Sequence, residues 1–183
     1  PRRSKYYEEI ITDVSKIFAW HNIKFIVDEQ NFWDTQNYIN MGNTISETTP
    51  GYRKYVNEMN DPNKVYILLV NIPSTEGNLG KAFLGGGCSI DGYAICQAGN
   101  RTGWNPMYTA QIISHEVGHL FGFQHVDASN KTCKCAFGDF CIMSPKTFWW
   151  SREYPSAFDS CNMKNLVAHP PKCLNNCPVM AAR

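Results

Sequence analysis

The spacing of three histidines, at positions 115, 119 and 125, limits the fold of this chain more than any other feature of the sequence. On an α-helix, His115 and His119 lie one turn apart and about 40° apart around the axis, so both imidazoles can reach one ion. His125 could not reach that ion if the helix continued, so the chain must turn sharply. Gly122 can take the positive φ that such a turn needs. The sequence therefore predicts a helix that ends near Gly122 and a chain that folds back.

The same residues predict a chemistry. Three neutral imidazoles with an open fourth position form the ligand set of a catalytic zinc site, where zinc lowers the pKa of a bound water towards about 7. Glu116 follows the first histidine and can take the proton of that water and pass it to a leaving amine. A His-Glu-x-x-His pattern alone also arises by chance on helix surfaces. Because Gly122 and His125 are present as well, a chance match is much rarer. We therefore predict one catalytic Zn²⁺ held by His115, His119 and His125, with Glu116 as general base and acid.

The composition is typical of one globular domain in an oxidising compartment. Of the 183 residues, 43% are hydrophobic and 18% are charged, which favours a packed core over disorder. The net charge of +1 provides no electrostatic footprint for nucleic acid or an anionic membrane, and no apolar run is long enough for a membrane span. The even number of cysteines, 8, favours a disulfide framework. We expect a secreted monomer that binds neither nucleic acid nor membranes.

Processing signals agree with secretion. Asn100 and Asn130 each begin an Asn-x-Thr tripeptide and are candidate glycosylation sites, although such tripeptides also occur by chance. The chain begins Pro-Arg-Arg without an apolar signal core, so we interpret it as the processed product of a precursor or zymogen. A solvated basic terminus is the alternative interpretation.

Hydrophobic periodicity predicts helices that alternate with strands before the histidine motif, and an irregular cysteine-rich part after it. The expected helices cover residues 6–18, 50–59, 106–122 and 160–169, and the expected strands cover residues 22–27 and 65–71. The fold class is therefore α/β (α+β), with a twisted mixed sheet and a central active-site helix. We predict a single domain over residues 1–183, with an upper part of about 1–124 and a smaller disulfide-rich lower lobe of about 125–183.

Residues 115–125, His-Glu-Val-Gly-His-Leu-Phe-Gly-Phe-Gln-His, resemble the elongated zinc signature of the metzincin endopeptidases. Residues 141–144, Cys-Ile-Met-Ser, resemble the tight turn that this family places beneath the metal. Met143 would then form a hydrophobic base under the ligands without binding zinc, which is also where an ordinary core methionine would lie. The sequence around Met143 resembles the adamalysin or reprolysin branch, which includes snake-venom metalloproteinases and ADAM proteases. It has a cysteine before Ile-Met and lacks the Met-x-Tyr sequence.

The resemblance also implies a substrate-binding surface. Residues 79–88 resemble the branch's edge strand, which binds an extended substrate by strand addition. The substrate contacts implied there are Lys81, Ala82, Phe83 and Leu84. A glycine-rich turn beside a core strand is the alternative. Residues 145–150 resemble the outer wall of the pocket for the side chain after the scissile bond, with Pro145 and Phe148 as candidate contacts. These aromatic residues could also pack beneath the lower lobe.

The disulfide pairing is likewise implied by the resemblance, because spacing alone does not determine connectivity. The implied disulfides are Cys88–Cys173, Cys133–Cys161 and Cys135–Cys141, which leave Cys96 and Cys177 as the fourth pair. Two departures stand out. Members of this branch usually have Asp directly after the third ligand, whereas this chain has Val126 and then Asp127. The family fold begins with a strand before its first helix, whereas this chain starts at what resembles that helix, so the strand is missing, cleaved off or supplied differently. Without it, Asn176 is the one recognisable remnant of the family's calcium site, and calcium is not assigned.

The resemblance therefore implies a secreted zinc endopeptidase that hydrolyses internal peptide bonds of extracellular proteins. Compact members of this kind are found among venom or salivary metalloproteinases of animals such as arachnids or snakes, so a toxin is one interpretation. A catalytically silent metzincin-like binding module is the alternative from another class. A matrixin-like protease is the alternative within enzymes, although the Cys-Ile-Met sequence and the number of cysteines disfavour it.

Overall fold

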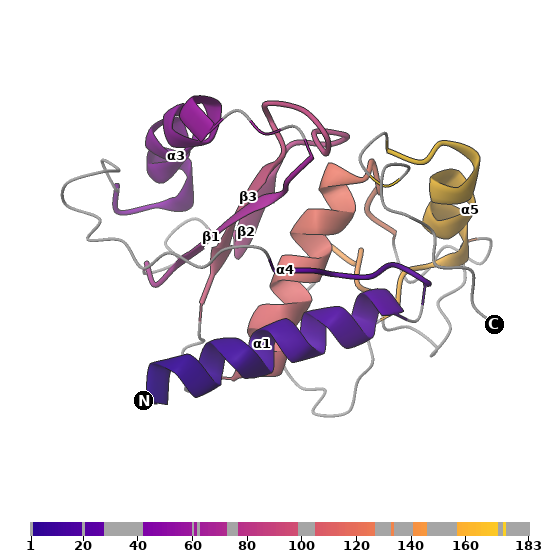
Figure 1. The fold of residues 1–183 in the computed structure, drawn as a ribbon, viewed down its shortest axis with the longest axis horizontal. Helices are drawn as coiled ribbons and strands as arrows, with labels where there is room; N and C mark the ends of the chain where they lie inside the picture. The colour runs from indigo at the N-terminus through magenta and orange to yellow at the C-terminus, as the bar shows by residue number, and fades with distance from the viewer. Residues whose placement is uncertain are drawn as a thin grey trace.

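The computed structural model describes residues 2–19, 21–27, 42–59, 61, 63–72, 77–98, 105–126, 133, 141–145, 157–171 and 174. Their elements follow the order α1 (Arg2–Ala19), α3 (Ile45–Met59), β1 (Tyr66–Val70), β2 (Gly80–Ala82), β3 (Tyr93–Gln97), α4 (Pro106–Leu120) and α5 (Ser160–Ala168). A small mixed sheet lies between α3 and α4, and α1 crosses α4 on the side away from the sheet (Figure 1). This is the predicted α+β class with a central helix.

The sheet has the order β1-β3-β2. β1 runs parallel to β3, and β2 runs antiparallel to β3, so β2 lies at an edge of the described sheet. All five residues of β3 are buried. Its side chains alternate between two cores, because Ala94 and Cys96 pack with α1 and α4 whereas Tyr93 and Ile95 pack with α3. A strand buried on both faces lacks the polar alternation of a surface strand, and β3 was not predicted from the sequence.

The core beneath the site forms where α1 packs on α4. Ile10, Val14 and Phe18 of α1 are at most 2% exposed and belong to the same cluster as Ile113 and Val117 of α4. Burial of such side chains contributes roughly 1.5–3 kcal/mol each, so this contact fixes the position of α4 under the sheet. The predicted helix over residues 6–18 is confirmed.

The start of α4 also follows the prediction. The side chain of Asn105 accepts a hydrogen bond from the backbone N–H of Tyr108, and Pro106 occupies the first helical position. Both residues suit a helix N-terminus. The Asn side chain accepts a hydrogen bond from a backbone N–H that has no partner within the helix, and Pro has no backbone N–H that would need a partner.

The second helix begins earlier than Pro50. Thr44 Oγ1 accepts a hydrogen bond from the backbone N–H of Glu47 (3.1 Å), and the Glu47 carboxylate accepts one from that of Asn43 (2.6 Å). This reciprocal cap starts α3 at Ile45 and leaves Pro50 inside the helix. The predicted start at Pro50 is wrong, because the cap at Thr44, six residues upstream, supplies the helix N-terminus.

Residues 22–27 form no strand in the structure. Asn22 takes a positive φ of 58° directly after α1, and Ile23 and Phe25 then pack against the main core. Phe25 stacks on Phe18 with the ring centroids 5.6 Å apart. The apolar alternation that predicted a strand is therefore used for packing, without a hydrogen-bonded ladder.

The remaining predicted elements are present. β1 matches the predicted strand over residues 65–71, and α5, whose N-cap is Asp159, matches the late helix over residues 160–169. Leu166 of α5 packs in the same cluster as α4. Among the described residues, no helix has both the length and the apolar character that crossing a membrane would require. The proposed division near residue 124 stays a prediction.

Candidate metal centre and active site

Three imidazole nitrogens meet at the C-terminal end of α4. The Nε2 atoms of His115 and His119 lie 3.1 Å apart, and His125 Nε2 lies 3.1 Å from that of His115 and 3.0 Å from that of His119. Tetrahedral zinc with Zn–N bonds of about 2.05 Å would place its nitrogen ligands about 3.3 Å apart. The spacing of the three rings therefore fits one zinc ion, and the three predicted ligands form a triad that could hold it.

Backbone carbonyls orient the two helical histidines. His115 Nδ1 lies 2.6 Å from the carbonyl oxygen of Ile142, and His119 Nδ1 lies 2.9 Å from that of Phe123. With Nδ1–H donating to each carbonyl, the lone pair of Nε2 points at the shared centre. Burial lowers the pKa of His115 to about 4 and also lowers the pKa of His119. Both rings are therefore neutral near pH 7, which is the form that binds a metal.

The turn that returns the third histidine is a glycine-terminated helix end. Gly122 has a φ of 86°, and its N–H donates to the carbonyl of His119 at 2.9 Å. The N–H of Phe123 donates to the carbonyl of Gly118 at 2.9 Å. These two bonds form a Schellman motif, which needs a residue that tolerates positive φ. The predicted role of Gly122 is confirmed, and His125 follows three residues later.

The turn that contains Met143 lies beneath the histidines. Met143 is fully buried, and its carbonyl accepts a hydrogen bond from Val126 N–H at 2.9 Å. Ser144 N–H donates to the carbonyl of Cys141 at 3.1 Å and closes the turn. A Cβ on Gly118 would lie 2.6 Å from Met143 Sδ, so a larger residue at this helical position would displace the buried methionine side chain. Gly118 was not predicted from the sequence, because the contact that requires a glycine there is with a residue 25 positions away.

Glu116 points from α4 towards the edge strand. Its side chain is buried, and burial raises its pKa to about 8. A Cβ on Gly80 of β2 would overlap the Glu116 carboxylate, so the glycine leaves the space that this side chain occupies. Gly80 was also missed, because nothing local in the sequence connects it with the helix.

The edge strand is anchored to the histidine helix by the glycine-rich loop that follows it. Gly85 N–H donates to the carbonyl of His119, and Gly87 N–H donates to that of Leu120, both at 2.8 Å. The predicted substrate contacts span two kinds of structure: Lys81 and Ala82 belong to β2, and Phe83 and Leu84 begin the turn. Lys81 and Leu84 are exposed, whereas Ala82 is half-buried.

A cavity of about 580 Å³ lies between α3 and the end of β2. Its lining includes Phe83, Pro50 and Arg53. Arg53 packs over the Phe83 ring with its guanidinium carbon 5.5 Å from the centroid, and it pairs with Asp91 at 3.0 Å. The cavity therefore extends the surface beside the edge strand.

The cysteines follow the predicted pairing only in part. Cys133 and Cys161 form a disulfide, as predicted. Cys88 and Cys141 each take part in a disulfide. Their predicted partners, Cys173 for Cys88 and Cys135 for Cys141, lie outside the described residues. Cys96 is a free, fully buried thiol on β3, so the predicted bridge to Cys177 is wrong. Its side chain faces the core beneath α4, and burial, with a smaller effect of Glu116, raises the pKa of the thiol.

Other predicted site residues are only partly described. Pro145 is exposed directly after the turn that contains Met143. Phe148, the glycosylation candidates Asn100 and Asn130, and Asp127 and Asn176 lie outside the described residues.

Comparison with known proteins places this geometry in context. A model of the "Reprolysin (M12B) family zinc metalloprotease" matches residues 3–178. The chain is 24% identical over 167 residues to the disintegrin and metalloproteinase domain-containing protein adm-2 of Caenorhabditis elegans, an alignment that covers 89% of this chain and 16% of the relative. It is 36% identical over 81 residues to the mouse disintegrin and metalloproteinase domain-containing protein 12, covering 40% of this chain and 8% of the relative. The chain thus spans less than a fifth of the length of these relatives.

Proposed function

Because the chain belongs to the reprolysin (M12B) family of zinc metalloproteases, we propose that it is a secreted zinc endopeptidase that hydrolyses internal peptide bonds of extracellular proteins. One observation carries the proposal: the three Nε2 atoms converge within 3.1 Å of one another, on the helix that also carries the buried Glu116. A family match alone would also fit a chain that had lost its ligands or its acid.

In this proposal His115, His119 and His125 hold one zinc ion, which when bound supplies a Lewis acid for the peptide carbonyl and the attacking water. Glu116 accepts the proton of the attacking water and donates it to the leaving nitrogen. Its raised pKa suits both steps, because a carboxyl that titrates near neutral pH is a stronger base than an ordinary glutamate and a usable acid afterwards. Burial against β2 keeps this group in one place.

The edge strand is proposed to bind the substrate backbone. β2 uses one side for its ladder with β3, and an extended peptide could add on the other side by main-chain hydrogen bonds. Lys81, Phe83 and Leu84 are exposed on this strand or directly after it, and the exposed Pro145 lies beyond the turn that contains Met143. The packing of Glu116 against Gly80 brings this strand next to the proposed base, as strand addition requires.

A peptide-library digestion tests the proposal. The zinc-loaded protein is incubated with the library with and without a chelator, and the products are read by mass spectrometry. We expect internal cleavages that the chelator abolishes and that excess zinc restores. Glu116→Ala should keep zinc, by elemental analysis, and lose cleavage by at least about a hundredfold.

The outcomes separate the alternatives. Zinc binding without any cleavage by the parent protein would favour a silent binding module. Cleavage by Glu116→Ala at the parental rate would refute the assigned base. A venom or salivary setting stays a prediction, which these experiments do not address.

A further inference from the structure

The third histidine differs from the other two because it lies outside the helix. His125 follows the turn at Gly122. The next residue is Val126, which has no carboxylate, whereas members of the reprolysin family usually have Asp at this position. On one side the segment is held by the bond from Val126 N–H to the carbonyl of Met143 at 2.9 Å. This hydrogen bond holds the backbone on the C-terminal side of His125. On its N-terminal side, Gln124 is held by another part of the chain.

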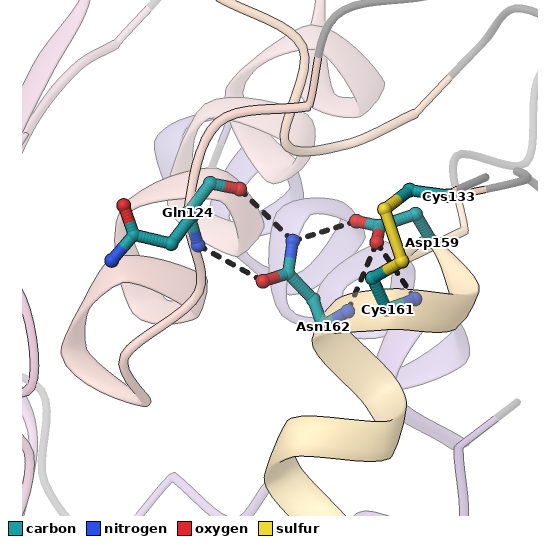
Figure 2. Close-up of a disulfide and its surroundings, with 5 residues drawn as sticks. All are labelled: Gln124, Cys133, Asp159, Cys161 and Asn162. Atoms are coloured by element: carbon teal, nitrogen blue, oxygen red, sulfur yellow. Dashed lines mark hydrogen bonds between the residues drawn. A yellow bond between two sulfur atoms is a disulfide. The ribbon is translucent and has the colours of Figure 1, made fainter. Parts of the chain in front are cut away.

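That part is the side chain of Asn162 on α5. Its Oδ1 accepts a hydrogen bond from the backbone N–H of Gln124 at 2.9 Å, and its Nδ2 donates to the carbonyl of Gln124 at 2.9 Å (Figure 2). One amide thus pairs with both backbone groups of the same residue, as a neighbouring strand would. Gln124 stands between Phe123, whose carbonyl orients His119, and His125 itself.

Asp159 fixes the orientation of this amide. Its Oδ2 accepts the second hydrogen of Asn162 Nδ2 at 2.7 Å, while its Oδ1 accepts the backbone N–H groups of Cys161 and Asn162 at 3.0 and 2.9 Å (Figure 2). Asp159 is fully buried and Asn162 is 5% exposed. The amide of Asn162 therefore has a partner for its oxygen and for both N–H bonds, and a flipped amide would place donors against donors and acceptors against acceptors.

The first turn of α5, which carries this pair, is itself anchored. Cys161 lies between Asp159 and Asn162 in the sequence and is joined to Cys133 by the disulfide (Figure 2). Further along the helix, Leu166 packs in the core shared with α4. The position of the Asn162 amide relative to the histidine helix is therefore determined by covalent and packing contacts.

We propose that Asn162, oriented by Asp159, is a positioning residue for the third zinc ligand. Its hydrogen bonds to Gln124 hold the backbone that presents the His125 ring, in place of a carboxylate directly after that ligand. This inference rests on the proposed zinc site, and it concerns metal affinity rather than the chemical step. Groups that orient ligands typically change metal affinity 10–100-fold when they are lost, so the effect is measurable.

The test measures zinc affinity directly, by competition with a chromophoric chelator, on the disulfide-intact protein. We expect Asn162→Ala to bind zinc about tenfold more weakly than the parent protein. Because tetrahedral Co²⁺ has visible absorption bands, the same variant loaded with Co²⁺ should show an altered spectrum. A purely structural role would leave that spectrum unchanged.

Leu166→Ala is the matched control, since it removes a buried side chain from the same helix that cannot hydrogen-bond to Gln124. It should lower the melting temperature and leave zinc affinity unchanged. Asp159→Ser keeps an N-cap oxygen and removes the acceptor for Asn162 Nδ2, so it should weaken zinc binding less than Asn162→Ala does.

Parental zinc affinity in Asn162→Ala would overturn the proposal, as would an equal loss of affinity in Leu166→Ala. If Asn162→Ala does not fold, Asp159→Ser decides, because unchanged affinity in that variant would overturn the orienting role. A parent protein that binds no zinc would instead refute the metal site itself, and the positioning role with it.

Discussion

The two histidines on α4 and the third histidine beyond it reach one point by different means. His115 and His119 are brought together by helical spacing, and their Nδ1 atoms face the nearby carbonyls of Ile142 and Phe123. His125 depends on a turn, a backbone bond to Met143 and the side chain of Asn162, 37 positions away in the sequence. The comparison teaches that a helix sets the spacing of two ligands locally, although the distant Ile142 carbonyl also orients the His115 ring, whereas the third ligand needs long-range contacts in addition to its turn.

Removing one ligand from each region gives the largest expected effect. Both His119→Ala and His125→Ala leave two imidazoles, and each should weaken zinc binding by roughly a hundredfold or more. We expect the greater loss in His119→Ala, because the pair left in His125→Ala is still prearranged by the helix. Chelator competition measures both values. A larger loss in His125→Ala would contradict the comparison.

Gly118 tests the contact between the helix and the turn below it. Alanine is a better helix former than glycine by about 1 kcal/mol, yet Gly118→Ala should lower the free energy of unfolding by about 1–3 kcal/mol, because its Cβ would lie 2.6 Å from Met143 Sδ. Chemical denaturation measures the change. In the double variant with Met143→Ala, the cost of the added methyl should be smaller than in the parent background. Additive losses would show that the overlap with Met143 is not the cause.

Gly80 tests the base separately from the metal. Gly80→Ala should lower kcat about tenfold, because its Cβ would displace the Glu116 carboxylate, while zinc affinity stays unchanged. Ile90→Ala, at an exposed position in the turn between β2 and β3, is the control and should leave kcat near that of the parent. If both variants lost kcat equally, the effect would belong to this part of the sheet and not to Glu116.

The last prediction concerns the pH dependence of the metal-free protein. Burial raises the pKa of Glu116 to about 8 in the folded state, well above its ordinary value of 4.5, so folding favours the protonated form. Stability from this group is fully present below pH 4.5 and is lost as pH rises through about 8. Relative to the parent, Glu116→Gln should therefore gain up to about 3 kcal/mol between pH 5 and pH 8, or roughly 10 °C in Tm. Thermal unfolding of both metal-free proteins measures it, and a constant difference across this range would contradict the burial of the charge.

Periodicity and motifs predicted much of the fold because they report on local geometry. The helices α1, α4 and α5 and the strand β1 follow from apolar spacing and caps, and Gly122 ends α4 as its position in the motif requires. Two errors came from the same local rules. Residues 22–27 alternate like a strand but pack without a ladder, and β3, buried on both faces, has no alternation to detect.

The sequence by itself determined the proposed metal-binding set, since the identity and spacing of His115, His119 and His125 allow one helix and one turn to bring them together. Only the tertiary structure decided what surrounds that set: the glycines that leave space for Met143 and Glu116, the unpaired state of Cys96, and the hydrogen bonds of Asn162 to Gln124. The physical reason is the separation in sequence over which each kind of contact acts. Helical geometry acts over about four residues, whereas these contacts join segments that meet only when the core has packed.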